Sequence, residues 1–582
     1  MYSIWRLCAF IVPTLAQLSL PNPPWLPPDA SAGARVTANP SSPNPQWSTL
    51  LGNLLYFYDA QRSGNLSSSN RVPWRNSSAM ADGKDVGIDL TGGYYDAGDY
   101  IKATYPLSFT LMSICWGALD YGQGYDQAKS TSATPYLDSM LRWGLDWLVK
   151  AHPAPSTLYV LVGNTDVDNA YWGGDENLPS FRPSYAINDT NPGTDAAAGA
   201  SAAFSACSAL YSGKGFNGAY SKPASLQDNA YSATLLTHAQ QLYSFAVNAT
   251  GGQKQYQKTV PAIAEAYSSS SFGDDLAIAA LFLGWASNNT GYYQEAENYF
   301  NQSKLSGQNS IFNWDSKTPG LYVLFAQIAQ SGSDLSSKLS AWQAECERYF
   351  DAIVNGNSGA SLTNDGLLYY KGDSDDASLN PALNAAMLMT RYAAIATTSD
   401  RKNSYSKFAQ SQVDYVLGKN SMSMPYIVGS NPNSPQNPHS AMASGGNDIN
   451  NINTSPPQEL HVLYGAVVGG PDRRGRFFDI RSDWPETEVA LDYNAPMLTL
   501  AAMHVMNDPN DPFFTTLQAG AYDKVRPSGQ PCDAAISDGC EKSGLSKGAT
   551  IALAVVLTVV GILIIGLVVW YIRVGRLRRR KY

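Results

Sequence analysis

Apolar side chains recur at helical spacing along most of this chain. Between residues 136 and 153 they fall at i, i+3, i+4, i+8 and i+11, which places them in one stripe along a helix: Leu137, Met140, Leu141, Leu145 and Leu148. Comparable segments, rich in Ala and Gly, occupy 195–211, 274–286, 320–330 and 384–396. Segments that alternate between apolar and polar residues are scarce. The pattern predicts an all-α protein whose helices approach one another closely.

The polar segments between the helices indicate how the chain is organised. No Pro- or Ser-rich linker interrupts residues 47–508, so we expect one large domain there. Long loops rich in Gly, Asn and Pro join its helices, which suggests a helical toroid with a site built from loops on one face. A large irregular bundle would give the same pattern. Residues 20–46, rich in Pro and Ser, predict a mobile leader, and residues 509–548 predict a polar stalk.

Both ends of the chain carry apolar segments. Residues 549–572 contain no charge, exceed the roughly 20 residues that a membrane-spanning helix needs, and end near Trp570 and Tyr571. The tail at 573–582 is strongly basic, which predicts a cytoplasmic tail. Residues 1–19 are largely apolar and predict a signal peptide. We therefore expect a single-pass protein of the plasma membrane with its large domain outside the cell.

Two further patterns agree with export. Glycosylation acceptor triplets of the form Asn-x-Ser/Thr begin at Asn65, Asn76, Asn188, Asn248, Asn288, Asn301 and Asn453. Cys532 and Cys540 are predicted to form an exposed disulfide, whereas Cys115, Cys207 and Cys346 are predicted to be buried thiols. No Cys/His spacing fits zinc, and a net charge of −9 argues against a nucleic-acid partner.

Carboxylates gather in two segments that lie far apart in the sequence. The first, GGYYDAGDYIK, contains Asp96 and Asp99, and the second, FFDIRSDWPETEVALDYNAP, contains Asp479 and Glu488. Glycosidic bonds are usually hydrolysed by two opposed carboxyl groups, one protonated and one ionised. On a glycine-rich loop, Asp96 and Asp99 can face one water molecule and act on it as a general base. A calcium-binding loop or a plain Asp/Gly turn would also fit this spacing.

The sequence around these carboxylates closely resembles glycoside hydrolase family nine, the endoglucanase family. The resemblance covers about residues 47–508. It includes residues 54–110 and then, in the family's order, LRWGLDWLVKAHP, VGNTDVDNAYWGGDE, NPGTDAAAG, SFGDDLAIAA, FNWDSKTPG and DYVLGKNSMSMPYIVG. Near the end of this region, the family's spaced catalytic pattern is satisfied by Phe477, Asp479, Trp484, Glu488, Ala490, Asn494 and Ala495.

This resemblance implies an (α/α)6 barrel that hydrolyses β-1,4-glucan with inversion and requires no cofactor. Glu488 would be the general acid that protonates the leaving oxygen, and Asp99 would be the base that activates water. Asp96 would help to hold that water. Asp479 would be a supporting carboxylate that orients groups around Glu488.

The resemblance also implies residues that bind sugar: Trp172, Tyr493, Trp314 and His439. The chain departs from the family pattern nearby. Asn169 stands where many members carry a sugar-contacting His, Asn380 stands where Arg is common, and the His-Arg pair that usually follows the position of His439 is missing. His439 as an ordinary loop histidine is therefore an alternative, and the number of sugar subsites stays open.

Calcium is common in this family, and Ser270, Asp274 and Asp275 resemble one of its oxygen-ligand clusters. Acidic residues are also favoured at a helix N-terminus by the helix dipole, which would produce the same pattern. A structural calcium ion is one interpretation of these residues and helix capping is the other.

We therefore predict an inverting endo-β-1,4-glucanase at the cell surface, with soluble or amorphous β-glucan as its substrate. An exo-acting cellodextrin hydrolase and a wall-remodelling glucanase are alternatives within the same enzyme class. A catalytically silent glycan-binding protein is an alternative of another class, motivated by the missing His and Arg residues. The presence of Asp96, Asp99 and Glu488 favours an enzyme.

Overall fold

The computed structural model describes residues 17–66, 70–129, 132–216, 220–537, 540 and 547–578. Its contacts divide the chain into two units. The first comprises Met1–Ser528 and Asp533–Ala535, and the second comprises Gly529–Cys532 and Ile536–Tyr582. Most of the predicted signal peptide, and the last residues of the basic tail, lie outside the described residues.

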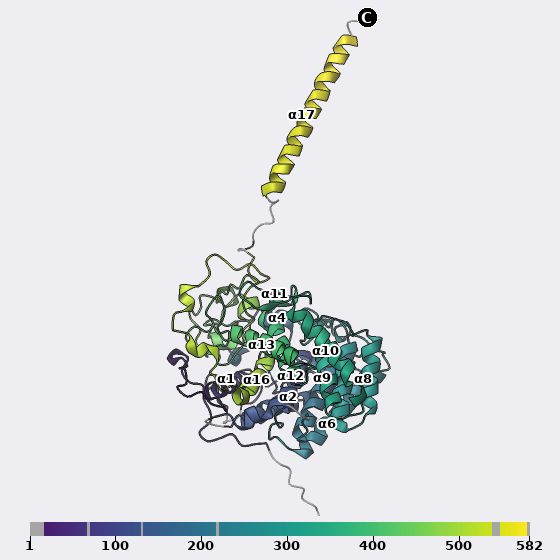
Figure 1. The fold of residues 1–582 in the computed structure, drawn as a ribbon, viewed down its shortest axis with the longest axis vertical. Helices are drawn as coiled ribbons and strands as arrows, with labels where there is room; N and C mark the ends of the chain where they lie inside the picture. Colours follow the sequence, from purple (N-terminus) through teal and green to yellow (C-terminus); the bar gives the residue numbers. More distant parts are fainter. Residues whose placement is uncertain are drawn as a thin grey trace, which may run out of the picture. The chain divides into compact units, whose positions relative to one another are not determined.

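Twelve helices of the described residues in the first unit form an inner and an outer ring (Figure 1). The inner helices contact one another in sequence order, and the last contacts the first: α2 (Thr104–Asp126), α5 (Thr194–Tyr211), α7 (Gly273–Ser287), α9 (Thr318–Gln330), α12 (Leu379–Ala393) and α16 (Leu491–Asn507). Each is preceded in the chain by an outer helix: α1 (Pro45–Ala60), α3 (Thr134–Ala151), α6 (Asn229–Asn248), α8 (Gly291–Gln302), α10 (Leu339–Val354) and α13 (Ser399–Val416). The predicted (α/α)6 barrel is confirmed.

The two rings differ in burial because they have different neighbours. All 18 residues of α5 are buried, and its many Ala side chains allow helices to approach it from several sides. Between α2 and α16, glycines make the contact: a Cβ atom on Gly117 would lie 2.0 Å from Thr499 Oγ1, and one on Gly124 would lie 2.0 Å from Ala502 O. The outer helix α3 instead buries one stripe, formed by the apolar residues predicted for it.

Short elements fill the loops between the rings. Three strands form an antiparallel sheet in the order β1 (Lys102–Ala103), β2 (Thr157–Val162) and β3 (Ser184–Asn188). A second antiparallel pair consists of β4 (Ser361–Leu362) and β5 (Leu368–Tyr369). Four short helices also lie in loops: α4 (Thr165–Asn169), α11 (Asp373–Asp376), α14 (Ala441–Ser444) and α15 (Trp484–Thr487).

The leader predicted to be mobile instead lies against the barrel from residue 17 onwards. The Leu18 N–H donates to Asp138 Oδ2 at 2.8 Å, and the Trp25 ring packs directly over Gly52 of α1. Asn44 then caps α1 by accepting hydrogen bonds from the first backbone N–H groups of the helix. The prediction of a mobile leader was wrong, because the composition of this segment does not show that its polar and aromatic groups contact the barrel.

The predicted stalk also begins later than expected. Phe514 and Tyr522 are buried, the Trp47 indole N–H donates to Asn510 O at 3.0 Å, and the Tyr522 hydroxyl donates to Phe477 O at 2.9 Å. The first unit therefore extends past residue 508, where the prediction ended it, because two aromatic anchors follow that point.

The structure contains two disulfides within its described residues. The predicted bridge between Cys532 and Cys540 is confirmed. Cys115 of α2 and Cys207 of α5 are also bonded, with their Cα atoms 5.1 Å apart, so the prediction of buried thiols was wrong for this pair. The two cysteines meet because the inner helices α2 and α5 pack against each other. They are 92 residues apart in the sequence, so the sequence alone does not indicate this contact. Cys346 is a buried free thiol, as predicted.

The second unit contains one long helix, α17 (Lys547–Arg578). Within it, residues Ile551–Arg576 are long and apolar enough to cross a membrane, and an 18-residue window of this stretch has a mean hydropathy of 3.1. Nearly all of the apolar side chains in this stretch are exposed in the structure.

Candidate active site

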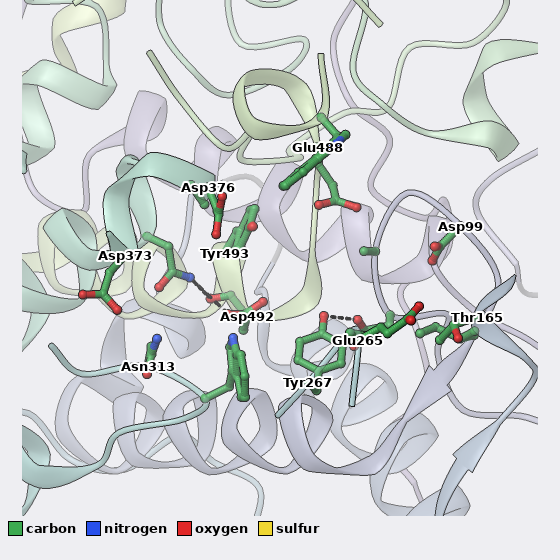
Figure 2. A pocket seen from close by; sticks show the side chains of 18 of the residues that line it. Asp99, Thr165, Glu265, Tyr267, Asn313, Asp373, Asp376, Glu488, Asp492 and Tyr493 are labelled. Atoms are coloured by element: carbon green, nitrogen blue, oxygen red, sulfur yellow. Dashed lines mark hydrogen bonds between the residues drawn. The ribbon is translucent and has the colours of Figure 1, made fainter. Parts of the chain in front are cut away.

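A cavity of about 430 Å³ opens among the loops that lead into the inner helices (Figure 2). Five of the six inner helices are preceded within a few residues by side chains that line it: Asp96, Ala97, Asp99 and Ile101 before α2, Glu265–Tyr267 before α7, Asn313 and Trp314 before α9, Asp373, Asp376 and Ala377 before α12, and Trp484 and Glu488 before α16. Thr165 and Asn169 of the short helix α4 also line it. The positive ends of five inner-helix dipoles therefore lie near this cavity, where they favour carboxylates.

Asp96 is held rigidly at the bottom of the first loop. Its backbone N–H donates to Ile101 O at 3.0 Å, and its carbonyl accepts from the Leu491 N–H at 3.1 Å, which ties the loop to the start of α16. The Tyr267 hydroxyl donates to Asp96 Oδ2, and burial raises the pKa of this carboxyl well above its usual value. Gly98 allows the loop to pass close to its neighbour, since a Cβ atom there would lie 2.1 Å from His439 O.

Asp99 lies in the cavity with one carboxylate oxygen unengaged. Among the described groups, Oδ1 has no hydrogen-bond partner, so it is available to a water molecule. Burial raises the pKa of Asp99 well above its usual value, and the neighbouring Asp168 carboxylate raises it further. Asp168 is itself fixed by the backbone N–H groups of Tyr100 and Ile101, at 3.0 and 2.9 Å from its Oδ2. The arrangement gives Asp99 a strongly basic carboxylate once it is ionised.

Glu488 enters the cavity from another wall, directly after α15. Its backbone is held on both sides, because the Gly469 N–H donates to Glu488 O at 2.9 Å and the His439 N–H donates to Thr487 O at 2.9 Å. In Figure 2 its carboxyl group points into the cavity towards the space between Asp99 and Tyr267. Burial, with a smaller contribution from Asp492, raises the pKa of Glu488 to about 8, so this carboxyl is protonated at neutral pH.

Asp479, the fourth predicted carboxylate, does not line the cavity. It accepts hydrogen bonds from the backbone N–H groups of Gln436 and Asn437, at 3.0 to 3.1 Å. This fixes the segment that continues to His439, whose backbone pairs with that of Glu488. Asp479 thus holds the loop whose backbone pairs with that of Glu488, and its supporting role in catalysis stays a prediction.

The four predicted sugar-binding residues separate into two pairs. Tyr493 and Trp314 line the cavity and are half-buried, so part of each ring is open to it. Trp172 is only 4% exposed, and its ring packs 4.9 Å from that of His439. The His439 Nδ1 also lies 2.7 Å from Arg481 O, so the structure favours the interpretation of His439 as a loop histidine. In this arrangement Trp172 offers no free face to a sugar.

Several residues in or beside the cavity were not predicted as functional. Asp168, Tyr267 and Asp492 contact or flank the predicted carboxylates, and Glu265, Asn313, Asp373 and Asp376 complete the polar wall. Asn380, noted in the sequence as a departure, donates through Nδ2 to Asp492 Oδ2 at 3.2 Å. Apart from Asp168, which lies in α4, they share a signal of position, since they lie shortly before, or at the first turn of, an inner helix. That signal appears only when the helix boundaries are known.

The proposed calcium ligands are only partly suited to that role. The Lys317 ammonium lies 2.8 Å from Asp275 Oδ1, and the Tyr105 hydroxyl donates to the same carboxylate, so Asp275 already has a cation. Asp274 accepts from the Ser271 hydroxyl at 3.0 Å and from the Lys317 N–H at 2.6 Å. Ser270 and Asp274 line a separate cavity of about 660 Å³. Calcium at Ser270 and Asp274 stays a prediction, and Asp275 does not fit it.

Comparison with known proteins agrees with this geometry. The family model described as glycosyl hydrolase family 9 matches residues 47–501. Endoglucanase A of Bacillus pumilus is 34% identical over 455 residues, which cover 77% of this chain and 64% of the relative. Endoglucanase 13 of Arabidopsis thaliana is 33% identical over 476 residues, covering 78% of this chain and 92% of the relative. The match to the bacterial protein therefore spans less than two thirds of that protein's length.

Solved structures of endoglucanases are also similar to this chain. An endoglucanase from the termite Nasutitermes takasagoensis superimposes with a TM-score of 0.70 at 34% identity, covering 79% of this chain and 98% of the termite chain. The endoglucanase CelQ of Clostridium thermocellum, solved with cellobiose and cellotriose, superimposes with a TM-score of 0.65 at 26% identity, covering 84% of this chain and 73% of CelQ. From its sequence, its barrel and its carboxylate-lined cavity, this chain belongs to glycosyl hydrolase family 9.

Proposed function

We propose that this protein is an inverting endo-β-1,4-glucanase. The observation that carries the proposal is the presence of two carboxyl groups on different walls of one cavity. Glu488 is protonated at neutral pH, and Asp99 presents an oxygen that has no partner among the described groups. A protonated acid and a separate base on different walls are the requirements of inverting hydrolysis. The relatives named endoglucanase support the same activity.

In the proposed mechanism each carboxyl has one step. Glu488 donates its proton to the oxygen of the leaving sugar as the glycosidic bond breaks. Asp99 removes a proton from the water that attacks the anomeric carbon from the opposite side. Asp96, fixed by Tyr267, helps to hold that water, and Asp479 keeps the Glu488 loop in place. The proton that leaves Glu488 is balanced by the one that Asp99 gains, so no cofactor is required.

The proposed substrate is a soluble or amorphous β-1,4-glucan. Polar groups dominate the cavity wall, and the half-open rings of Tyr493 and Trp314 offer apolar faces to the C–H surfaces of sugar rings. A related structure was solved with cellobiose and cellotriose, which is the same class of ligand.

Turnover and product configuration test this proposal. The full chain, purified in detergent, is incubated with carboxymethyl cellulose and with cellodextrins, and the first product is followed by NMR. We expect the α-configured sugar first and a fall in viscosity faster than the rise in reducing ends. The β-configured sugar as first product would exclude inversion. A lack of turnover on every β-1,4-glucan would exclude an enzyme and leave a glycan-binding protein.

Replacing Asp168 with Asn is expected to move the acidic limb of the pH profile of kcat/KM to lower pH. The negative charge of Asp168 raises the pKa of Asp99, so its removal lowers that pKa, and the base is ionised at lower pH. We expect a shift on the order of 1 pH unit, because Asn can still accept hydrogen bonds from the Tyr100 and Ile101 N–H groups. The measurement is the pH profile of cellodextrin hydrolysis from about pH 3 to about pH 9, because burial places the pKa of Asp99 above the usual carboxyl values.

A buried aspartate at another place provides the control. Asp195 accepts hydrogen bonds from the Tyr256 N–H and does not line the cavity, so Asp195→Asn should leave the acidic limb in place. An unshifted limb in Asp168→Asn, or one moved to higher pH, would show that Asp168 does not act on the base.

We also propose that the catalytic unit lies outside the cell, anchored by α17. The apolar stretch of α17 and the basic residues after it support a membrane span with a cytoplasmic tail. Two disulfides support an oxidising compartment. The side chains that begin all of the acceptor triplets are exposed, as glycosylation requires: Asn65, Asn76, Asn188, Asn248, Asn288, Asn301 and Asn453. Cleavage of the barrel by a protease added to intact cells would test this orientation.

A further inference from the structure

A groove of about 630 Å³ lies on the outside of the barrel, between two helices of the outer ring. Its walls come from α6 and α8, which both pack on the inner helix α7 (Figure 1). Its volume is within the range of about 300 to 1,000 Å³ that is usual for small-molecule sites. Among the described residues, none lines both this groove and the active-site cavity. The groove is therefore a separate place on the molecule.

Two tyrosine rings give the groove an apolar wall. Tyr292 and Tyr299 are half-buried and lie seven residues apart on α8, so they share one face of that helix. The buried Tyr243 of α6 packs edge-to-face against Tyr292, with the ring centroids 5.4 Å apart, and its hydroxyl donates to Glu295 Oε2 at 2.7 Å. These contacts hold the wall in place before any ligand binds. Aromatic rings that are partly open suit the C–H faces of sugars.

The rest of the groove is polar but carries little charge. Exposed amide side chains from both helices, and from the loop after α6, line it: Gln240, Gln253, Asn298 and Gln302. Amides can both donate and accept hydrogen bonds. Among the described residues that line the groove, Glu295 is the one charged residue, and its carboxylate accepts from Tyr243. Such a surface suits a neutral ligand rich in hydroxyl groups and does not suit an ion.

Asn248, one of the predicted glycosylation acceptors, lies in the groove itself. It is the last residue of α6, and its side chain is exposed. Its Nδ2 donates at 3.4 Å to the Oγ of Ser244, which also lines the groove. An N-linked glycan is attached to this nitrogen, so its first sugar would begin inside the groove. The other predicted acceptors do not line it: Asn65, Asn76, Asn188, Asn288, Asn301 and Asn453.

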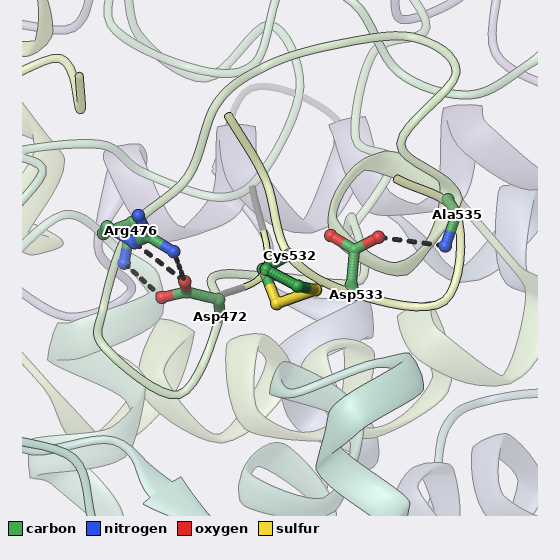
Figure 3. Close-up of a disulfide and its surroundings, with 6 residues drawn as sticks. Asp472, Arg476, Cys532, Asp533 and Ala535 are labelled. Atoms are coloured by element: carbon green, nitrogen blue, oxygen red, sulfur yellow. Dashed lines mark hydrogen bonds and ion pairs between the residues drawn. A yellow bond between two sulfur atoms is a disulfide. The ribbon is translucent and has the colours of Figure 1, made fainter. Parts of the chain in front are cut away.

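We propose that the groove holds the first sugars of an N-linked glycan attached to Asn248. The glycan comes from a lipid-linked oligosaccharide diphosphate. Asn248 Nδ2 gives up one proton to the transferring enzyme and bonds to the anomeric carbon of the first sugar, as the bond from that carbon to the diphosphate oxygen breaks. Since the sugar is tethered, weak contacts with Tyr292 and Tyr299 suffice to hold it. The proposal rests on the export proposed above, which the disulfide of Cys532 supports (Figure 3).

Release of the glycans from the native protein, measured site by site, tests this inference. The full chain is purified in detergent from cells that glycosylate exported proteins and is treated with a peptide-N-glycosidase. Release converts each acceptor Asn to Asp, which mass spectrometry detects. We expect release at Asn248 to be about tenfold slower than at Asn65, the factor that contacts totalling about 1.4 kcal/mol provide. After unfolding, both sites should be released at the same rate, because the groove no longer exists.

Removal of the groove's side chains should expose the glycan. We expect Tyr292→Ala combined with Tyr299→Ala to raise the rate at Asn248 to that at Asn65. Tyr231→Ala is the matched control, because Tyr231 is a half-buried tyrosine of α6 outside the groove, and it should leave the rate unchanged. Gln240→Ala combined with Asn298→Ala changes only exposed side chains, so it should keep the fold and raise the rate part of the way.

Equal release at Asn248 and Asn65 in the native chain would overturn the proposal, as would slow release that the two tyrosine replacements leave unchanged. Glycans at other acceptors but none at Asn248 would also overturn it, and would leave the proposed export intact. A lack of glycan at every acceptor would contradict both. Binding of cellohexaose by the glycosylated chain that is lost with the tyrosine replacements would show that the groove is open to free glucan instead.

Discussion

Replacing Glu488 with Gln should lower kcat on cellodextrins by roughly 10²- to 10⁴-fold, the usual contribution of a general acid. Gln keeps the size of the side chain but cannot donate a proton to the leaving oxygen as an acid does. The backbone at Glu488 is held by Gly469 and by the segment of His439, so we expect the fold to persist. KM and the unfolding midpoint should therefore stay close to those of the unchanged protein.

The leaving group distinguishes loss of the acid from general damage to the site. A 2,4-dinitrophenyl β-cellobioside has a leaving group that departs without protonation, so Glu488→Gln should hydrolyse it with a much smaller loss than it shows on cellodextrins. Glu176→Gln, at an exposed position outside the cavity, is the matched control and should change neither rate. An equal loss on both substrates would exclude Glu488 as the acid.

Replacing Asp99 with Asn should also lower kcat by roughly 10²- to 10⁴-fold, but on both kinds of substrate. Attack by water requires removal of a proton whether or not the leaving group needs one. The amide of Asn has nearly the size of the carboxylate and can still occupy the place beside Asp168, so the loss should reflect the missing base.

An anionic nucleophile tests that interpretation. Azide carries no proton to be removed, so it should restore turnover of the activated cellobioside by Asp99→Asn and give the α-configured glycosyl azide. The same concentration of azide should not restore hydrolysis of cellodextrins by Glu488→Gln. The β-configured azide would contradict inversion, and a lack of rescue in Asp99→Asn would indicate that Asp99 has another role.

The sequence determined the features that depend on local chemistry. The helical stripe of α3 and the Ala-rich core of α5 follow from which side chains recur along each segment. The motifs around Asp99 and Glu488 were sufficient to single out two residues that line one cavity, because a glycine-rich loop and a carboxylate in a fixed frame are visible in the sequence itself. The disulfide between neighbouring Cys532 and Cys540 is local in the same sense.

Only the tertiary structure decided which distant groups meet. The loops before five inner helices converge with the short helix α4 on one cavity, and this places Asp168 beside Asp99 and Tyr267 on Asp96. Packing of neighbouring helices joins Cys115 to Cys207, and packing against the loop of His439 buries Trp172. The physical reason is the distance along the sequence over which each effect acts. Propensity and periodicity act over a few residues, whereas burial, charge compensation and free ring faces here depend on neighbours that lie more than a hundred residues away in the sequence.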